Sequence, residues 1–335
     1  MILVTGGTGM VGAHLLLQLT QNGQKVRATH RKDSNLKRVE EIFAYFTPEA
    51  SQLFKTIEWV VADITDLPAM EIAFQGVTQV FHCAAYISFR THDYQKLKSI
   101  NNNGTANVVN LCLSHKVDYL CYVSSIATLG TPIDGATANE DSHWNPEENN
   151  NVYAISKYGA EMHVWRATQE GLKAVIVNPG VILGEGNWNS GSGRIFKKAS
   201  KGMKHYTSGG SGFVDVKDVV SSMLALTEKQ ITNQRYILVG HNATYRELLQ
   251  LLMKGFSLPE PKKSVSKRTL TWLSYLDGFV SFLLGKHRRL TKESVASLTT
   301  VSTFSSEKIK QQLGMKFTPL EETISRVAKN YSSSS

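Results

Sequence analysis

A glycine-rich turn near the amino terminus constrains the fold of this chain more than any other feature. A strand-like run beginning at Ile2 leads into the stretch "VTGGTGMVGAHL", whose second half has helical character. Gly6, Gly9 and Gly12 in this stretch have the spacing G-x-x-G-x-x-G. Glycines in that context let the chain turn tightly and bring bare backbone N–H groups against a pyrophosphate at the positive end of a helix. The pattern predicts a dinucleotide-binding strand–turn–helix rather than a purely structural turn.

Apolar strand-like runs alternate with helical stretches over the first 180 residues. Helices are predicted over about 11–21, 97–114 and 153–170. Alternation of this kind predicts an α/β fold in which a Rossmann-type, doubly wound parallel sheet carries helices on both faces. The strand-like runs are "MILVTG", "KVRATH", "IEWVVAD", "VTQVFHCAA", "VDYLCYVSS" and "KAVIVNPG".

The alternation of strand-like and helical stretches stops after Gly180, where glycine- and serine-rich stretches are predicted to form loops. Strand-like signal returns in "GFVDV" and "RYILVG", and the remainder from about residue 244 is mostly helical. We therefore expect a dinucleotide-binding domain over 1–180 and 211–240, and a smaller, mostly helical C-terminal substrate lobe over 181–210 and 241–330. Substrate would bind in the cleft between them. Residues 331–335 are expected to form a disordered tail.

The composition is that of a globular protein with an excess of positive charge. The hydrophobic fraction is 41% and the formal net charge is +9. A phosphate-bearing cofactor is sufficient to explain this charge, and nucleic-acid binding is not expected because no DNA- or RNA-binding motif accompanies it. The three cysteines, Cys83, Cys112 and Cys121, lie in apolar runs without C-x-x-C spacing. They are interpreted as core residues of a cytoplasmic protein, with no metal site and no stable membrane insertion.

The stretch 268–286 combines aromatic and leucine side chains with flanking lysines and arginines. Trp272, Leu276, Phe279, Val280 and Leu283 recur in it at helical spacing. We interpret the stretch as a core helix or a lid over the substrate pocket. An anchor at a membrane interface is the alternative.

The end of the second strand bears on the choice of dinucleotide. An acidic residue there accepts hydrogen bonds from the adenosine ribose, whereas a basic residue meets a 2′-phosphate. The strand "VRATH" is followed by Arg31 and Lys32, and Asp33 comes late. This order favours NADP(H), because guanidinium matches phosphate geometry, and NAD(H) remains the minority interpretation. If Arg31 and Lys32 are only solvent-exposed charges at the start of a helix, the sequence does not decide between NADP(H) and NAD(H).

The glycine motif resembles that of the short-chain dehydrogenase/reductase superfamily. Four further stretches, "VVADITD", "FHCAA", "NNNGTANVV" and "YVSSIATLG", resemble in order and spacing its extended branch, the NAD-dependent epimerase/dehydratase family. The likeness covers nearly the whole chain and is closest to dihydroflavonol 4-reductase-like proteins and 3β-hydroxysteroid dehydrogenases. The residues that the resemblance implies for the cofactor are Gly6, Gly9, Met10, Val11, Gly12, Arg31, Lys32, Asp63, Ile64, Ala84, Ala85, Asn101, Tyr153, Lys157, Pro179 and Val181.

Two Tyr-x-x-x-Lys pairs occur, Tyr94 with Lys98 and Tyr153 with Lys157, so spacing alone cannot select a catalytic pair. Tyr153 follows the strand "YLCYVSS" and starts the next helix, which directs it to the same strand ends as Ser125. Tyr94 lies before that strand. The resemblance implies that Tyr153 and Lys157 are catalytic, and a plain pair on a helix face is the alternative.

Each member of the predicted catalytic set has a chemical role. Tyr153 is the proposed acid in carbonyl reduction, and a lysine ammonium one helical turn away would favour its phenolate. The resemblance implies that Lys157 holds the nicotinamide ribose and that Ser125 hydrogen-bonds the carbonyl oxygen. Ser124 alternates with Ser125 across the strand, and the family pattern selects Ser125. Asn101 would support either a water relay or the fold of its helix.

This chain differs from the motifs of the family's dehydratases and sugar-nucleotide enzymes, and these differences limit which reaction it is expected to catalyse. Dehydratases of the branch carry Thr-Asp-Glu where this chain has Ser125, Ile126 and Ala127, and Ser211 stands where sugar-nucleotide enzymes tend to have a basic residue. We therefore expect an NADP(H)-dependent oxidoreductase that reduces a ketone or aldehyde of a medium-sized, largely apolar small molecule. The alternatives are an NAD-dependent nucleotide-sugar epimerase and a non-catalytic NADP(H)-sensing protein.

Apolar and aromatic residues between the two predicted lobes suit such a substrate. Those expected to line its pocket are Tyr86, Phe89, Trp188 and Tyr206, with Ile87 and Ile182. Each could equally belong to the core of the lobe. Many members of the family dimerise through the helices that follow the fourth and fifth strands, which implies a possible homodimer.

Overall fold

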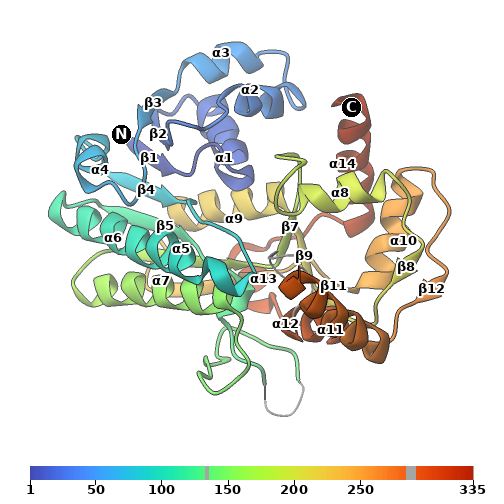
Figure 1. The fold of residues 1–335 in the computed structure, drawn as a ribbon. Coiled ribbons are helices and arrows are strands. Elements are labelled where there is room, and N and C mark those ends of the chain that lie inside the picture. Colours follow the sequence, from blue (N-terminus) through green and yellow to red (C-terminus); the bar gives the residue numbers. More distant parts are fainter. Residues whose placement is uncertain (133–135, 284–291, 335) are drawn as a thin grey trace.

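The computed structural model describes residues 1–132, 136–283 and 292–334, and among these the side chains outside 278–283 and 292–293. A seven-stranded sheet in the order β10-β6-β5-β4-β1-β2-β3 forms its centre (Figure 1). All neighbouring strands in it are parallel. This order confirms the predicted Rossmann-type fold, with one strand added beyond β6. The strands are β1 (Ile2–Thr5), β2 (Val26–His30), β3 (Glu58–Val61), β4 (Gln79–His82), β5 (Tyr119–Val123), β6 (Ala174–Pro179) and β10 (Gln234–Leu238).

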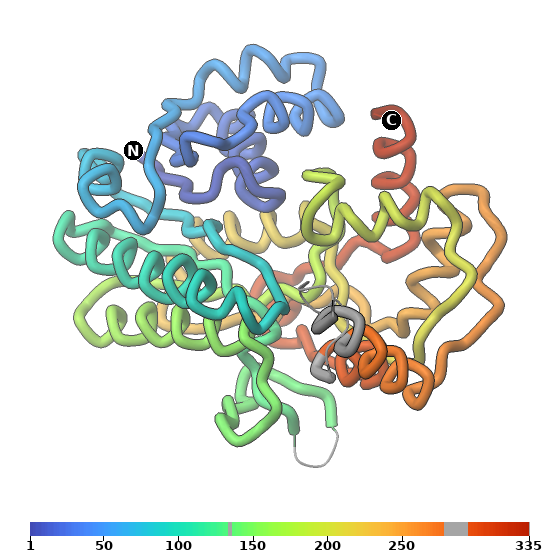
Figure 2. The backbone as a smooth tube through the Cα atoms, viewed as in Figure 1, coloured from blue at the N-terminus to red at the C-terminus, as the bar shows by residue number. Residues whose placement is uncertain are grey.

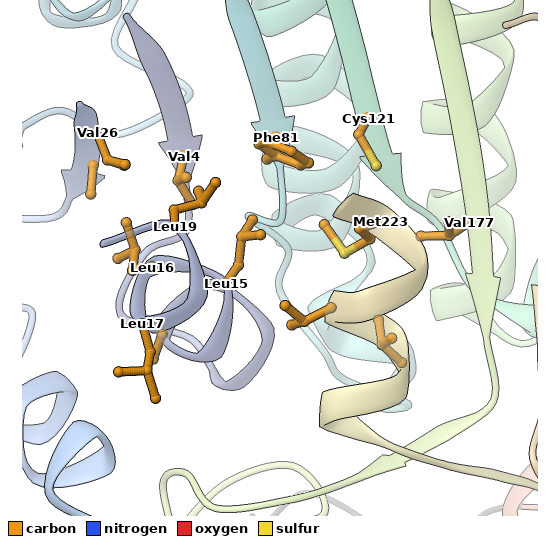
Figure 3. Close-up of a cluster of buried hydrophobic side chains, with 14 of the residues drawn as sticks. Val4, Leu15, Leu16, Leu17, Leu19, Val26, Phe81, Cys121, Val177 and Met223 are labelled. Atoms are coloured by element: carbon orange, nitrogen blue, oxygen red, sulfur yellow. The ribbon is translucent and has the colours of Figure 1, made fainter. Parts of the chain in front are cut away.

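Successive side chains along each strand enter two separate cores, one on each face of the sheet. Val4 and Cys121 pack under α1 and α9, as Figure 3 shows, whereas Leu3 and Tyr122 pack on the opposite face under α6 and α7. Strands buried on both faces explain why their sequences read as continuous apolar runs. The helices of the first face are α1 (Met10–Gln21), α2 (Lys37–Ala44), α3 (Ala50–Lys55), α9 (Val216–Glu228) and α13 (Glu307–Leu313); those of the second are α4 (Leu67–Ala73), α6 (Gly104–Ser114) and α7 (Val152–Gln169).

The helix predicted over 97–114 is irregular in its first half. It consists of α5 (Tyr94–Leu97), a π-helical turn (Lys98–Asn103) and then α6. Such wide turns inside helices are rare and frequently lie at functional sites. Short 3₁₀ turns occur at Thr91–Asp93 and Ile126–Thr128.

A second, three-stranded sheet in the order β11-β9-β7 lies beyond the carboxyl end of β6. The sequence assigned β9 to the dinucleotide-binding domain, but β9 pairs with β7 and β11 instead, because the chain leaves the main sheet after Pro179 and returns to it only at β10. The lobe core packs α8, α10 and α14 on this sheet. The elements of this part are β7 (Val181–Leu183), α8 (Gly193–Ala199), β8 (His205–Tyr206), β9 (Gly210–Asp215), β11 (His241–Thr244), α10 (Tyr245–Gly255), β12 (Lys263–Ser264), α11 (Lys267–Leu283), α12 (Lys292–Thr299) and α14 (Leu320–Ser334).

Residues 331–334 are helical, whereas the sequence predicted a disordered tail over 331–335. Figure 2 shows this segment, in red, rising beside the yellow-green α8. Tyr331 packs its ring against Trp188 and Phe256, and these contacts carry α14 through the serines to Ser334. Within the described ranges, no helix is long and apolar enough to cross a bilayer.

Candidate active site

The glycine turn begins at the carboxyl end of β1, a central strand of the main sheet. Gly6 has a φ of 70°, a conformation that favours glycine, and a Cβ there would lie 2.7 Å from the backbone of Ala84. A Cβ on Gly12 would overlap the carbonyl oxygen of Gly6. Gly9 is the N-cap of α1 and has no side chain to accept from the first-turn N–H groups. These N–H groups therefore remain available to an anion at the positive end of α1, as a dinucleotide pyrophosphate requires.

The remaining residues predicted for the cofactor surround this turn at the carboxyl ends of neighbouring strands. Ala84 and Ala85 follow β4, directly beside β1, and Asp63 and Ile64 follow β3. The Asp63 carboxylate accepts hydrogen bonds from the backbone and side chain of Thr65. The crevice outside β1 and β4 is the point where the strand order reverses, which is where doubly wound sheets bind ligands. The residues present therefore fit a dinucleotide. Met10 and Val11 begin α1, and Pro179 and Val181 mark the passage from β6 to β7.

Arg31 and Lys32 lie exposed immediately after β2. The Arg31 Nε atom donates to Asp33 Oδ1 over 3.2 Å, yet 57% of the Arg31 side chain remains exposed. The Arg31 guanidinium, first by its hydrogen bond and then by its charge, lowers the pKa of the Asp33 carboxyl. The Asp33 carboxylate is therefore hydrogen-bonded to Arg31. The Arg31 guanidinium is still exposed at the surface, where it can bind a phosphate.

We expect Gly9→Ala to weaken dinucleotide binding about tenfold or more while leaving the fold intact, because only bare backbone can approach a pyrophosphate this closely. Gly9 has a φ of –80°, which alanine tolerates, and its Cβ would meet one atom, the Gly6 carbonyl oxygen at 3.3 Å. Fluorescence titration with NADPH and thermal unfolding would measure the two effects. Gly12→Ala should impair both, since its Cβ has no room. Undiminished binding by the Gly9 variant would show that the turn does not hold the cofactor.

The end of β5 brings the predicted hydroxyl groups together. Ser125 caps the 3₁₀ turn that follows β5, with its Oγ accepting from the Ala127 N–H. Tyr153 lies in the first turn of α7 and is 9% exposed. Burial raises the pKa of Tyr153 to about 12, and a hydrogen bond with Ser125 acts in the opposite direction. Tyr153 therefore keeps its proton at neutral pH in the cofactor-free protein, the state that a proton donor needs.

Lys157 is buried, and its ammonium group reaches the end of β5. Its Nζ donates to the Tyr122 hydroxyl over 2.6 Å and to the Val123 carbonyl over 2.8 Å, which leaves one ammonium hydrogen for a further acceptor. Burial lowers the pKa of Lys157 to about 7, although the charge of Glu161 opposes that shift. The sequence predicted that Lys157 would favour the Tyr153 phenolate, but burial has the larger effect on this tyrosine.

The second Tyr-x-x-x-Lys pair has a different environment. Tyr94 is half-buried in α5, and Lys98 is exposed to solvent. Lys157, in contrast, is 1% exposed. Only the Tyr153 pair therefore combines a buried lysine with the end of β5.

The buried carboxylate of Glu161 holds the residues at the end of β5 in place by hydrogen bonds. Glu161 Oε2 accepts from the Ser124 hydroxyl over 2.6 Å, from Thr128 over 2.8 Å and from Asn178 over 3.0 Å. Its other oxygen accepts from Trp165 over 3.2 Å and lies 3.4 Å from Nη1 of Arg235. Ser124 thus points to Glu161, and Ser125 is the hydroxyl on the side of Tyr153. The sequence analysis missed Glu161, although its position four residues after Lys157 places both on one face of α7.

Asn101 lies in the π-helical turn and is 1% exposed. Its side-chain amide exchanges two hydrogen bonds with the backbone of Tyr86, and its Nδ2 also donates to Ser156 Oγ over 2.9 Å. Asn101 therefore ties the loop after β4 to α7 next to Lys157.

The four residues predicted to line a substrate pocket come from two parts of the chain, the loop after β4 and the C-terminal lobe. Phe89 is 55% exposed and packs edge-on against Tyr153, with their ring centroids 5.4 Å apart. The Tyr86 hydroxyl donates to Asp93 over 3.3 Å. Trp188 and Tyr206 pack against the core of the C-terminal lobe.

An ion cluster joins the last helix to the first. Arg326 of α14 donates to both carboxylate oxygens of Glu185 and to Asp215. His14 of α1 lies 3.6 Å from the same Glu185. Although burial acts to raise it, the hydrogen bonds and charges of His14 and Arg326 lower the pKa of Glu185 to about 2. The neighbouring Gly184 and Gly186 lie directly against Met10 at the start of α1, so this cluster holds a loop beside the glycine turn.

The nucleotide-binding turn, the parallel sheet and the strand-end cluster define an NAD(P)-dependent oxidoreductase of Rossmann type. The model of the NAD dependent epimerase/dehydratase family matches residues 2–240. The chain belongs to this family, as the sequence resemblance predicted.

Two relatives and one solved structure extend the comparison over nearly the whole chain. The putative dihydroflavonol 4-reductase of Synechocystis sp. is 28% identical over 96% of this chain and 91% of its own length. Sterol demethylase protein B of Methylococcus capsulatus is 28% identical over 93% of this chain and 92% of its own. The crystal structure of gox2253 superposes with a TM-score of 0.83 at 27% identity, covering 99% of this chain and 98% of that one.

Proposed function

We propose that the protein uses NADPH to reduce a ketone or aldehyde of a medium-sized, largely apolar small molecule. The observation that carries the proposal is the meeting of Tyr153, Ser125 and Lys157 at the end of β5, with the Tyr153 side chain buried. A bound dihydronicotinamide would supply the hydride to the carbonyl carbon. The Tyr153 hydroxyl would deliver the proton to the carbonyl oxygen, and the Ser125 hydroxyl would donate a hydrogen bond to that oxygen as charge develops on it. The remaining hydrogen of the Lys157 ammonium would bind a ribose oxygen.

Two features support an apolar substrate. Phe89, which is exposed, packs on the proposed proton donor, so an aromatic surface borders the reacting position. Relatives named for a dihydroflavonol and for a sterol match 96% and 93% of the chain. Both names denote bulky ring systems that carry oxygen substituents.

The test is consumption of NADPH by the purified protein with a panel of cyclic and aromatic carbonyl compounds. Absorbance of the reduced nicotinamide should fall only when a suitable carbonyl is present. An epimerase would instead retain NAD through purification and interconvert sugar nucleotides without net oxidation. Finding that behaviour would replace the reductase proposal while keeping the family.

The preference for NADPH rests on Arg31. We expect Arg31→Ala to raise the KM for NADPH by roughly tenfold to a hundredfold, because a charge-assisted hydrogen bond to phosphate contributes about 1.5–3 kcal/mol. The KM for NADH, which lacks the 2′-phosphate, should stay unchanged. Steady-state kinetics with each cofactor measures this, with the exposed Lys55→Ala on α3 as the matched control. An equal effect on both cofactors would remove the basis for the preference.

A cytoplasmic location and a homodimer complete the proposal. All three cysteines are unpaired, as expected in a reducing compartment. The helices α6 and α7, which follow the fourth and fifth strands, lie side by side on one face of the main sheet, where members of this family pair (Figure 1).

A further inference from the structure

The amino-terminal half of α11 turns its apolar side outward. Leu270 and Ser274, one helical turn apart, are 8% and 0% exposed and form the inward side. Arg268, Trp272 and Tyr275 follow at spacings of four and three, so they share the opposite side. Trp272 is 61% exposed and Tyr275 57%. The sequence analysis interpreted this stretch as a core helix or a pocket lid, and the exposure of Trp272 contradicts a core position for its side chain.

Leu273 and Leu276 extend this apolar surface, with exposed fractions of 41% and 39%. Lys267, Arg268, Thr271, Trp272 and Tyr275 together line a hollow of about 550 Å³. The other residues of the predicted apolar stripe, Phe279, Val280 and Leu283, lie outside the described side chains. The outward surface formed by Trp272, Leu273, Tyr275 and Leu276 is called the α11 face below.

A band of positive charge borders the α11 face. Lys262, Lys263, Lys267 and Arg268 are all exposed within seven consecutive residues. Pairing of β12 with β8 fixes Lys263 beside His205, and the Lys263 N–H donates to the Lys204 carbonyl over 3.2 Å. Glu260, the nearest acidic residue before the band, accepts a hydrogen bond from the neutral Gln250 over 2.8 Å and keeps its charge, but the four cations outnumber it. The band therefore presents a net positive surface.

We propose that the α11 face and its basic band dock the protein on the surface of an anionic lipid bilayer. Trp and Tyr favour the boundary between headgroups and acyl chains, and Lys and Arg beside them meet lipid phosphates. A protein partner fits less well, because three of the four clustered cations are lysines, which protein interfaces tend to exclude. The helix would lie along the bilayer surface, in keeping with the absence of a spanning helix among the described residues. The docking does not depend on the proposed reduction.

Co-sedimentation with vesicles tests the proposal on the full-length protein. Vesicles of phosphatidylcholine containing a quarter phosphatidylglycerol should sediment the protein at low salt, and pure phosphatidylcholine should not. High salt should weaken the binding, because screening shortens the reach of the basic band. Absence of binding to the anionic vesicles would overturn the proposal.

Two double variants separate the contributions of the surface. Trp272→Ser with Tyr275→Ser, and Lys267→Glu with Arg268→Glu, should each reduce the fraction bound about tenfold or more. The matched controls are Leu67→Ser with Ile72→Ser, which are 48% and 62% exposed on α4, and Lys25→Glu with Lys55→Glu. Equal losses in the controls would overturn the assignment to α11. So would light scattering, without lipid, that shows a dimer of the parent protein and a monomer of the Trp272 and Tyr275 variant, because the α11 face would then join two copies.

Discussion

Replacing Tyr153 with phenylalanine is expected to reduce the rate of carbonyl reduction by about 10²–10⁴-fold, the usual contribution of a positioned general acid. The substitution removes one hydroxyl from a buried ring and keeps the packing of that ring against Phe89. NADPH binding should therefore persist while kcat falls. Single-turnover kinetics and a separate cofactor titration would measure the two quantities.

Tyr94→Phe provides the control for this prediction. Tyr94 has the same spacing to a lysine, but its partner Lys98 is exposed to solvent. Its replacement should leave turnover unchanged. Full activity of the Tyr153 variant would refute the role proposed for this hydroxyl, whereas loss of NADPH binding would point to damage at the cofactor turn.

Replacing Glu161 with glutamine is expected to lower both the stability of the protein and the pH at which its activity declines. Glu161 is fully buried and balances Arg235, so removing its charge should cost about 3 kcal/mol of unfolding free energy. Asn178 now donates a hydrogen bond to a carboxylate oxygen of Glu161. If the NH₂ group of the new glutamine occupied that position, two donors would face each other without an acceptor. Denaturant unfolding would measure the loss.

The pH effect follows from Lys157. Its pKa is about 7, and the Glu161 charge works against the burial that lowers it. Without that charge the pKa falls further, and less of the ammonium form remains at neutral pH. The alkaline limb of the kcat/KM profile, which reports the free enzyme, should move to lower pH.

Glu170→Gln is the matched control, since Glu170 follows the end of the same helix and its pairing with Arg166 is half exposed. It should change neither stability nor the pH profile. If the Glu161 variant loses stability but keeps the parent profile, the carboxylate supports only the fold.

The fold could be predicted from the sequence because its signals are local. Gly12 meets a steric limit set within the first turn itself, because a Cβ there would overlap the carbonyl oxygen of Gly6. The parallel strands are buried on both faces and so stand out as apolar runs. The order of Ser125 and Tyr153 along the chain then places both at one strand end, because parallel strands all finish at the same edge.

Other features depend on contacts that no local pattern encodes. In the sequence, Glu161 is indistinguishable from any other acidic residue of a helix. Its role depends on contacts with Ser124, Asn178 and Arg235, which come from three other segments of the chain. The amphipathic pattern around Trp272 indicates a helix without indicating which side faces the protein. The terminal serines suggested disorder, yet ring contacts of Tyr331 extend the helix through them.

The ion cluster around Glu185 has a consequence for how the protein is made. The loop beside the glycine turn is held by Arg326, which lies in the middle of α14. During synthesis the amino-terminal strands and helices emerge from the ribosome long before this arginine does. The nascent chain can therefore assemble most of its sheet early, but the loop beside the glycine turn is fixed only after α14 has been made.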